Sequence, residues 1–251
     1  MADTKVEQNF GSIAREYDDY AVAQAHAADE LLDFTPAVEP DSILEPGCGT
    51  GIYTRLVARR FPEASIRAVD LSEDMVRVAR EKLHKQNVTF AVRDAEEEPQ
   101  RDFDLITSGA TFQWYRDLSG TLGRYRRALR SGGALSFSYF GPRTYRELHH
   151  CLAEVTGQEE TLDAASFADR PRLRELMNIH FKSYRVEERR FRQDFDNLRE
   201  LLRSIKLTGA RGRRTGVRWT PGLLKELESC YREHYGGIRA TYQVFLCRGK
   251  I

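Results

Sequence analysis

The stretch from Ile43 to Gly51, ILEPGCGTG, places three glycines within five positions directly after an apolar run. A strand that enters a tight glycine turn before a helix leaves backbone N–H groups free to bind a cofactor. A dinucleotide-binding turn has the spacing GxGxxG, whereas the third glycine here comes one position early and Ile52 follows it. The pattern is instead E-x-G-x-G-x-G, with Glu45 two residues before Gly47. That acid would repel a pyrophosphate, and it suits a cofactor with a cationic amino group.

Strands and helices alternate on both sides of this turn over the first 140 residues. Apolar runs predict strands at 42–44, 65–69, 88–92, 103–107 and 134–140, and helical spacing predicts helices at 52–61, 74–83 and 118–129. Ser72 is expected to cap the second of these helices, and the third is expected to stop at Ser131-Gly132-Gly133. The alternation predicts an α/β fold with a doubly wound, largely parallel sheet.

The remaining segments extend this core at both ends. Residues 5–33 have helical spacing, helices are predicted at about 143–156, 169–180, 196–207 and 220–234, and strands at 183–193 and 238–247. We expect both late strands to complete the sheet as an antiparallel edge, which gives seven strands. The chain then divides into an N-terminal helical cover at 1–40, a cofactor-binding core at 41–142 and a sheet-completing part at 143–251. Within this last part, an inserted helical lid is expected at about 194–236.

Acidic residues follow the second and third predicted strands, at the edge where the glycine turn lies. Asp70 comes nineteen residues after Gly51, where a carboxylate can bind both hydroxyls of a ribose. Together with the glycine turn, this arrangement resembles the motifs of the Rossmann-like (class I) methyltransferases, which implies S-adenosylmethionine as the cofactor. The resemblance also implies that Asp94 and Ala95 bind the adenine, whose faces Leu71 and Met75 would cover. The full predicted cofactor set is Gln24, Glu45, Gly47, Gly49, Gly51, Asp70, Leu71, Met75, Asp94, Ala95 and Ser108.

Longer motifs outside the glycine turn are similar to those of one methyltransferase family. They are the helix motif at 10–24, ATFQW at 110–114, the FGxxTxxELH run at 140–149, RSIKLTGA at 203–210 and ATYQVFL at 240–246. On these residues the chain resembles, over nearly its whole length, the malonyl-acyl-carrier-protein O-methyltransferases of biotin synthesis. Ile13 and the arginine-rich ARGRR at 210–214 depart from that family's pattern. The resemblance implies that the free carboxylate of a malonyl thioester is converted to its methyl ester.

A carboxylate acceptor is already ionised at neutral pH, so its methylation needs no general base. The enzyme has to align the carboxylate, the methyl group and the sulfur, and it has to exclude water. The malonyl carboxylate needs a cation or a hydroxyl to orient it, and Lys206 and Tyr17 are the predicted residues. Trp114 and Tyr242 are predicted as walls of the pocket. The alternatives are a solvated position for Lys206 and a core position for Tyr242.

Charge is distributed unevenly along the chain. Residues 1–140 carry 17 Lys and Arg against 23 Asp and Glu, whereas residues 141–251 carry 22 against 15. The second part, with a net charge of +7, is therefore the one expected to meet an acidic partner. The family resemblance implies an acyl-carrier protein as that partner. The predicted docking residues are Arg211, Arg213, Arg214 and Arg218, and the alternative for this run is a merely solvated basic loop.

Three other functions stay open on the sequence. A methyltransferase for a free small acid, of the trans-aconitate type, would need cations in its pocket but no basic docking face. An RNA methyltransferase would use the positive second part, although the basic run lacks interleaved aromatic residues for base stacking. In addition, the segment 108–111 reads SGAT where an amine-methylating enzyme would have an NPPY-like motif. A binding module that keeps the cofactor without turnover is the third alternative.

Composition argues against several other classes of protein. The four cysteines include no CxxC pair and the six histidines show no metal-ligand spacing, so no metal is expected. The N-terminal sequence lacks the apolar region of a signal peptide, and no run of eighteen apolar residues predicts a membrane span. We therefore expect a cytoplasmic enzyme with reduced thiols and without nucleic-acid or membrane partners.

Overall fold

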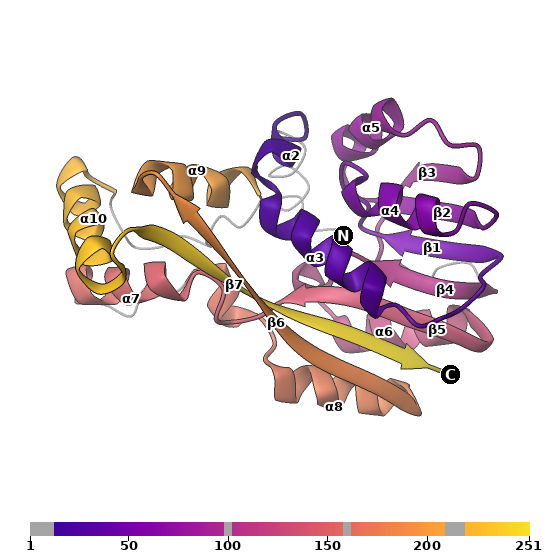
Figure 1. The fold of residues 1–251 in the computed structure, drawn as a ribbon. Helices are drawn as coiled ribbons and strands as arrows, with labels where there is room; N and C mark the ends of the chain where they lie inside the picture. The colour runs from indigo at the N-terminus through magenta and orange to yellow at the C-terminus, as the bar shows by residue number, and fades with distance from the viewer. Residues whose placement is uncertain (1–12, 98–101, 158–161, 209–218) are drawn as a thin grey trace.

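The computed structural model describes residues 13–97, 102–157, 162–208 and 219–251. Within these residues the strands form one seven-stranded sheet in the order β3-β2-β1-β4-β5-β7-β6 (Figure 1). The strands are β1 (Ser42–Pro46), β2 (Ser65–Asp70), β3 (Val88–Val92), β4 (Phe103–Ser108), β5 (Leu129–Phe140), β6 (Ser183–Phe195) and β7 (Ile238–Lys250). The predicted α/β fold with a seven-stranded, mostly parallel sheet is confirmed.

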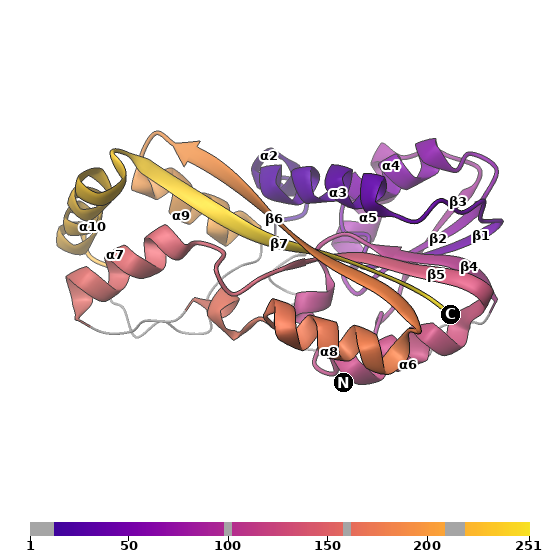
Figure 2. The same ribbon diagram turned by 60° about the horizontal axis from the view of Figure 1, so that its bottom comes forward.

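Helices cover both faces of this sheet, because successive side chains of a strand point to opposite faces. One face carries α3 (Val22–Phe34), α4 (Ile52–Arg60) and α5 (Glu73–Lys82), and the short α2 (Tyr17–Tyr20) precedes them. The other face carries α6 (Leu118–Ala128) and α8 (Arg170–His180), as Figure 2 shows. In β1, for example, Ile43 packs with the first group of helices and Leu44 with the second. None of the described helices has the length and apolar character needed to cross a bilayer.

The last two strands run in opposite directions. β7 is antiparallel to both of its neighbours, β5 and β6, so β6 is parallel to the first five strands. The two late strands thus complete the sheet as the predicted antiparallel edge. Before β6 begins, α8 packs beside α6 and leads back along the sheet. After β6, α9 (Leu198–Leu207) and α10 (Pro221–Tyr235) lie beyond its far end, and β7 therefore returns in the opposite direction.

β6 and β7 continue past the end of β5 as a two-stranded ribbon. The last pair between β5 and β7 joins Phe140 to Val244, whereas β6 and β7 stay paired as far as Phe195 and Ile238. The ribbon leads to α9 and α10, and α7 (Arg146–Thr156) packs against α10 beside it (Figures 1 and 2). The helical insertion predicted before the last strand is thus present as α9 and α10.

Two local predictions have different outcomes. Ser72 caps α5 as predicted, since its Oγ accepts a hydrogen bond from the Met75 N–H at 3.3 Å. The predicted helix stop at residues 131–133 is wrong, because α6 ends at Ala128 and β5 begins with the next residue. Gly132 has a φ of +78° and lies near the point where the pairing register of β4 and β5 shifts. These glycines therefore form an irregularity inside the strand.

Candidate active site

A cleft of about 1480 Å³, including its solvent-filled mouth, opens at the carboxyl ends of β1, β2 and β4. Sheets of this type bind ligands at the edge where the strand order reverses, which here lies between β1 and β4. We call one wall the turn side, formed by residues 47–50, 70–71 and 94–96. The opposite wall, which we call the tyrosine side, comprises Tyr17, Phe140, Thr144, Tyr145, Thr208 and Tyr242.

The turn side is built on the glycine turn, which hydrogen-bonds to the end of β2. The N–H groups of Gly47 and Cys48 donate to the Val69 carbonyl at 2.7 and 3.0 Å. The turn's three glycines have φ angles from +52° to +86°, a region that other residues rarely adopt. A Cβ on Gly47 would lie 2.2 Å from Thr111 Cγ2, whereas a Cβ on Gly49 would meet open space. The turn therefore presents bare backbone to the cleft at Gly49, which is a cradle for a ligand.

Asp70 ends β2, and two backbone groups hold its carboxylate. Oδ2 accepts from the Gly49 N–H and Oδ1 from the Ser72 N–H, both at 2.9 Å. Burial raises the pKa of this carboxyl group, and the backbone hydrogen bonds oppose that shift. The residue is only partly buried and lines the cleft. Asp70 is therefore oriented by the turn and still accessible to hydroxyl groups of a ligand.

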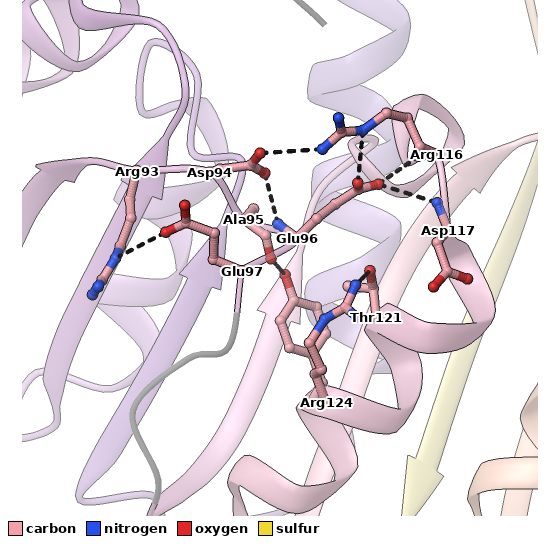
Figure 3. Close-up of polar contacts among 10 residues, drawn as sticks. Arg93, Asp94, Ala95, Glu96, Glu97, Arg116, Asp117, Thr121 and Arg124 are labelled. Atoms are coloured by element: carbon pink, nitrogen blue, oxygen red, sulfur yellow. Dashed lines mark hydrogen bonds and ion pairs between the residues drawn. The ribbon is translucent and has the colours of Figure 1, made fainter. Parts of the chain in front are cut away.

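The loop after β3 completes the turn side, and ion pairs hold it in place (Figure 3). Arg116 bridges two acids, with its Nη2 at 3.4 Å from Asp94 Oδ2 and its Nε at 3.1 Å from Glu96 Oε2. The Tyr125 hydroxyl donates to the Ala95 carbonyl at 2.6 Å. Asp94 and Ala95, the two residues predicted to bind adenine, both line the cleft.

Glu45 lies beneath the glycine turn and does not line the cleft. Its carboxyl group is fully buried, and among the described residues its oxygens have no hydrogen-bond partner of good geometry. Burial raises the pKa of this group to about 8, the Thr54 hydroxyl opposes the shift, and the charge of Asp70 adds to it. A cationic group of a ligand at the turn would favour the ionised form of Glu45. The structure thus fits a cofactor that carries an ammonium group.

The tyrosine side is rich in buried hydroxyl groups. The rings of Tyr145 and Tyr242 meet edge to face with centroids 5.1 Å apart, and the two residues are 4% and 3% exposed. Burial raises the pKa of Tyr242 to about 12 and also raises that of Tyr145, so both phenols are neutral donors at neutral pH. Among the described residues, no Lys or Arg lines this side. An anionic ligand here would be held by neutral hydroxyls.

Glu147 positions the two tyrosines by joining their segments. Its buried carboxylate accepts from the N–H of Thr241 at 2.9 Å and from the hydroxyl of the same residue at 2.5 Å. Burial acts to raise the pKa of Glu147, but the hydrogen bonds from Thr241 lower it below the ordinary value. Tyr145 adopts a φ of +62°, and its N–H donates to the Thr241 carbonyl at 2.8 Å. The surrounding contacts therefore hold Tyr145 in a backbone conformation that bulky residues rarely adopt.

Aromatic side chains complete the cleft between its two walls. The short helix η1 (Phe112–Trp114) places Trp114 against Phe167, edge to face with ring centroids 5.5 Å apart. Phe167 follows a second short helix, η2 (Asp163–Ser166). Both rings line the cleft, as does Phe140 at the end of β5. These rings can exclude water from a bound substrate.

Eleven predicted residues are brought together in this cleft. They are Tyr17, Gln24, Gly47, Gly49, Asp70, Leu71, Met75, Asp94, Ala95, Trp114 and Tyr242. The cleft is formed by segments that are widely separated along the chain, from α2 to β7. The binding roles assigned to these residues stay predictions.

Four predicted residues lie off the cleft wall, and Glu45 is one of them. Gly51 is instead the N-cap residue of α4, with a φ of +86°. The Ser108 hydroxyl is buried and donates to the Pro46 carbonyl at 2.6 Å. Lys206 is exposed on α9, because the apolar residues of that amphipathic helix occupy its inner face. The expectation that Lys206 points into the pocket is therefore wrong. Arg211, Arg213, Arg214 and Arg218 lie outside the described residues.

Several lining residues were missed by the sequence predictions. Tyr145 and Thr144 belong to the FGxxTxxELH run, and Thr208 belongs to RSIKLTGA. Those motifs were the available signal, but nothing in their spacing shows which members face a cleft. Tyr53 was also missed; its hydroxyl hydrogen-bonds to the buried Thr107 hydroxyl at 2.7 Å.

Comparison with known proteins identifies the class of enzyme to which the chain belongs. The family model described as "Methyltransferase domain" matches residues 43–133. Malonyl-acyl-carrier protein O-methyltransferase 1 of Ilyobacter polytropus is 36% identical, over 92% of this chain and 87% of that protein. The crystal structure of the YcgJ protein from Bacillus subtilis is 16% identical, with a TM-score of 0.62 over 90% of this chain and 97% of that one.

A second solved structure shares the fold and contains a cofactor. Phosphoethanolamine N-methyltransferase 2 of Haemonchus contortus, in complex with S-adenosyl-L-methionine, is 20% identical to this chain. Its TM-score is 0.57, and the match covers 95% of this chain and 57% of that one. The glycine turn, the strand order and the relatives thus agree, and the chain is a methyltransferase that belongs to the malonyl-acyl-carrier-protein O-methyltransferase family.

Proposed function

We propose that the protein transfers a methyl group from S-adenosylmethionine to the free carboxylate of a malonyl thioester on an acyl-carrier protein, in biotin precursor synthesis. The observation that carries this proposal is the tyrosine side, where the buried, neutral Tyr145 and Tyr242 line the same cleft as the glycine turn. S-adenosylmethionine, when bound, supplies a methyl group on a positively charged sulfur, which an ionised carboxylate accepts in one displacement. No general base is needed, because a carboxylate is ionised at neutral pH.

The turn side has the donors and acceptors to hold this cofactor. Asp70 would accept hydrogen bonds from the ribose hydroxyls, and Asp94 with Ala95 would bind the adenine. The bare backbone at Gly49 would admit the amino-acid part of the cofactor. Beneath it, the Glu45 carboxyl group would lose its proton and complement the ammonium charge.

The tyrosine side would orient the acceptor carboxylate. Tyr145 and Tyr242 are neutral donors, and a hydrogen bond to a charged group contributes roughly 1.5–3 kcal/mol. Neutral donors fix the direction of a carboxylate without the full charge neutralisation that an arginine or lysine would bring. Trp114, Phe140 and Phe167 would exclude water from the aligned groups.

The carrier would dock on α9, where the predicted lid begins. Arg199, Arg203 and Lys206 are exposed, and their spacing of four and then three residues places them on one face of the helix. Thr208, directly after α9, lines the cleft, so the Lys206 end of this basic face lies next to it. Lys206 thus changes its proposed role, from a pocket cation to part of a docking surface. The arginines at 211–218 follow it in the sequence.

The proposed division of the chain supports the same function. Residues 41–142 supply the turn side, whereas 1–40 supply Tyr17 and 143–251 supply the other tyrosines. The segment 194–236 would act as the lid over the acceptor. This division and the lid are part of the proposal.

The test is product formation with matched acceptors. Purified protein with S-adenosylmethionine is offered malonyl-carrier, malonyl-coenzyme A, trans-aconitate or bulk RNA, and methyl transfer is measured by mass spectrometry. We expect a methyl ester on the malonyl group, with the highest kcat/KM for the carrier form. The single-turnover rate at saturating cofactor should be flat from about pH 6.5 to 8.5, because the carboxylate stays ionised and the phenols stay protonated. Methylation confined to the free acid or to RNA would refute the proposal.

A further inference from the structure

A second cluster of potential ligands lies between α7 and α10, outside the cleft. His150 and Glu154 lie four residues apart on α7, and His234 is near the end of α10. One ligand atom from each of these residues lies within 4.8 Å of the other two. Glu154 Oε2 is 2.9 Å from His234 Nε2 and 3.6 Å from His150 Nε2. Three side chains from two helices therefore converge on one point.

A fourth residue orients one of the imidazole rings. The Tyr235 hydroxyl is 2.8 Å from His150 Nδ1, on the opposite side of the ring from the cluster. If Nδ1 carries the proton and donates to this hydroxyl, Nε2 presents its lone pair toward Glu154. Metal-binding histidines are commonly fixed in this way, by a hydrogen bond from the ring nitrogen that does not bind the metal.

The donor set indicates the class of ion. Two imidazoles and one carboxylate suit Zn²⁺ and related transition metals, whereas Mg²⁺ and Ca²⁺ prefer oxygen ligands alone. The three side chains are 35–47% exposed, so an ion can reach them from solvent. We propose that His150, Glu154 and His234 form a Zn²⁺ site that joins α7 to α10, with water in the fourth position.

A buried pair of thiols lies close to this cluster. The test has to distinguish zinc binding by the thiols from zinc binding by the cluster. Cys151 is adjacent to His150 in sequence, and its Sγ is 2.6 Å from that of Cys230 on α10. Both thiols are buried, whereas the three proposed ligands are exposed, so an ion from solvent reaches the cluster first.

The site has a mechanical consequence for the tyrosine side. α7 begins directly after Tyr145, and the chain passes from α10 into β7, which carries Tyr242. An ion that joins the two helices therefore restrains both segments that supply the buried phenols. The proposal itself does not depend on the identity of the methyl acceptor.

The test is zinc binding by the metal-stripped full chain, with a phosphine reductant present to keep the thiols reduced. Competition with a chromophoric zinc indicator should give one ion per chain, and ZnCl₂ should raise the thermal midpoint whereas MgCl₂ should not. His150→Ala and His234→Ala should each weaken zinc binding at least about tenfold. His84→Ala, which removes an exposed histidine between α5 and β3, should bind like the wild type.

Two further variants keep the proposal open to refutation. Cys151→Ser should retain the zinc affinity, and a loss comparable to that of His234→Ala would assign the metal to the thiols. Unchanged affinity in the His150→Ala, His234→Ala double variant would overturn the site, as would a wild type that binds no zinc at roughly hundred-micromolar concentration. Circular dichroism of each variant shows that a lost affinity is not a lost fold.

Discussion

The two walls of the cleft are built in different ways. The turn side comes from consecutive strand ends within residues 47–96, and each residue is placed by its own strand and turn. The tyrosine side collects side chains from α2, the end of β5, the end of α9 and the β7 ribbon, which are far apart in the sequence. The turn side is therefore a local structure, whereas the tyrosine side exists only when the whole chain is folded. Substitutions on the two walls should accordingly affect different binding steps.

The largest effect is expected from Gly47→Val. A Cβ at this position would overlap Thr111, and the φ of +72° already disfavours a β-branched residue. The glycine turn should not form, and calorimetry should show cofactor affinity reduced more than about 100-fold, with a lower thermal midpoint. Gly157→Val is the matched control, because its φ of +67° is similar but a Cβ there meets open space. Equal losses in both variants would mean that the contact with Thr111 carries none of the effect.

Glu45→Gln tests the buried carboxyl group beneath the turn. Its pKa of about 8 in the folded chain is above the ordinary value of 4.5, so the folded state retains a proton that the unfolded state releases. The free protein should therefore lose up to about 5 kcal/mol of stability as pH rises from about 4.5 to 8. Urea unfolding across this range should show a smaller fall for Glu45→Gln. If both proteins have the same pH dependence, Glu45 does not titrate in this window.

The double variant Tyr145→Phe, Tyr242→Phe tests the proposed role of the tyrosine side. Loss of two hydrogen bonds to a carboxylate should lower kcat/KM for malonyl-carrier roughly 100-fold or more. Cofactor affinity should stay within about twofold, because neither hydroxyl lies on the turn side. The control for the removal of a phenol is Tyr184→Phe on β6. This ring packs against the core on the face of the sheet that α6 and α8 cover. A parallel loss of cofactor affinity would show that the two walls do not act separately.

Asp70→Ala is the counterpart on the turn side. Removing the carboxylate should weaken S-adenosylmethionine binding by about 2–3 kcal/mol, through hydrogen bonds lost to the ribose and to the turn. The KM for malonyl-carrier at saturating cofactor should change little. Asp70→Asn keeps one acceptor oxygen, so its affinity for S-adenosylmethionine should lie between those of the wild type and Asp70→Ala. Calorimetry that shows full affinity in a folded Asp70→Ala protein would remove this residue from the site.

The smallest effect is expected from charge reversal on α9. Each exposed charge should contribute only about 0.2–1 kcal/mol to carrier docking. Arg199→Glu with Lys206→Glu should raise the KM for malonyl-carrier several-fold and spare malonyl-coenzyme A. High salt should abolish the difference, because it screens exposed charges. The variant Arg213→Glu with Arg214→Glu should have the same effect as the α9 variant if the arginine run belongs to the same docking surface.

Controls for this last comparison come from the same chain. Arg172→Glu reverses an exposed charge on α8, which covers the other face of the sheet, and should leave both substrates unaffected. If the α9 variant loses activity equally on both malonyl substrates, α9 is not a docking surface.

The contrast between the walls also explains what the sequence could predict. Asp70 and Asp94 are found because each follows an apolar strand, and parallel strands end at one edge of the sheet. Tyr145 and Thr208 meet only through the folding of the ribbon and its helices, so no local spacing identifies them. Lys206 was predicted to point into the pocket. The apolar positions 198, 201 and 205 of its own helix already indicate an inner face that does not include it.

Residues distant in sequence show the same limit elsewhere in the molecule. His150 and His234 are 84 positions apart, and neither has a histidine at helical spacing. The contact between α6 and α8 likewise joins distant segments that share no motif, so the sequence did not predict it.

The β6–β7 ribbon has a consequence for how such enzymes diversify. Tyr242 lies beyond the last residue pair between β7 and β5, so this part of the tyrosine side belongs to a segment of β7 that pairs only with β6. Mutations that lengthen, twist or recharge the ribbon are therefore expected to change the tyrosine side around Tyr242 and to leave the glycine turn in place. Under the proposed function, a lineage with this architecture would acquire a new acceptor without passing through a form that has lost its donor.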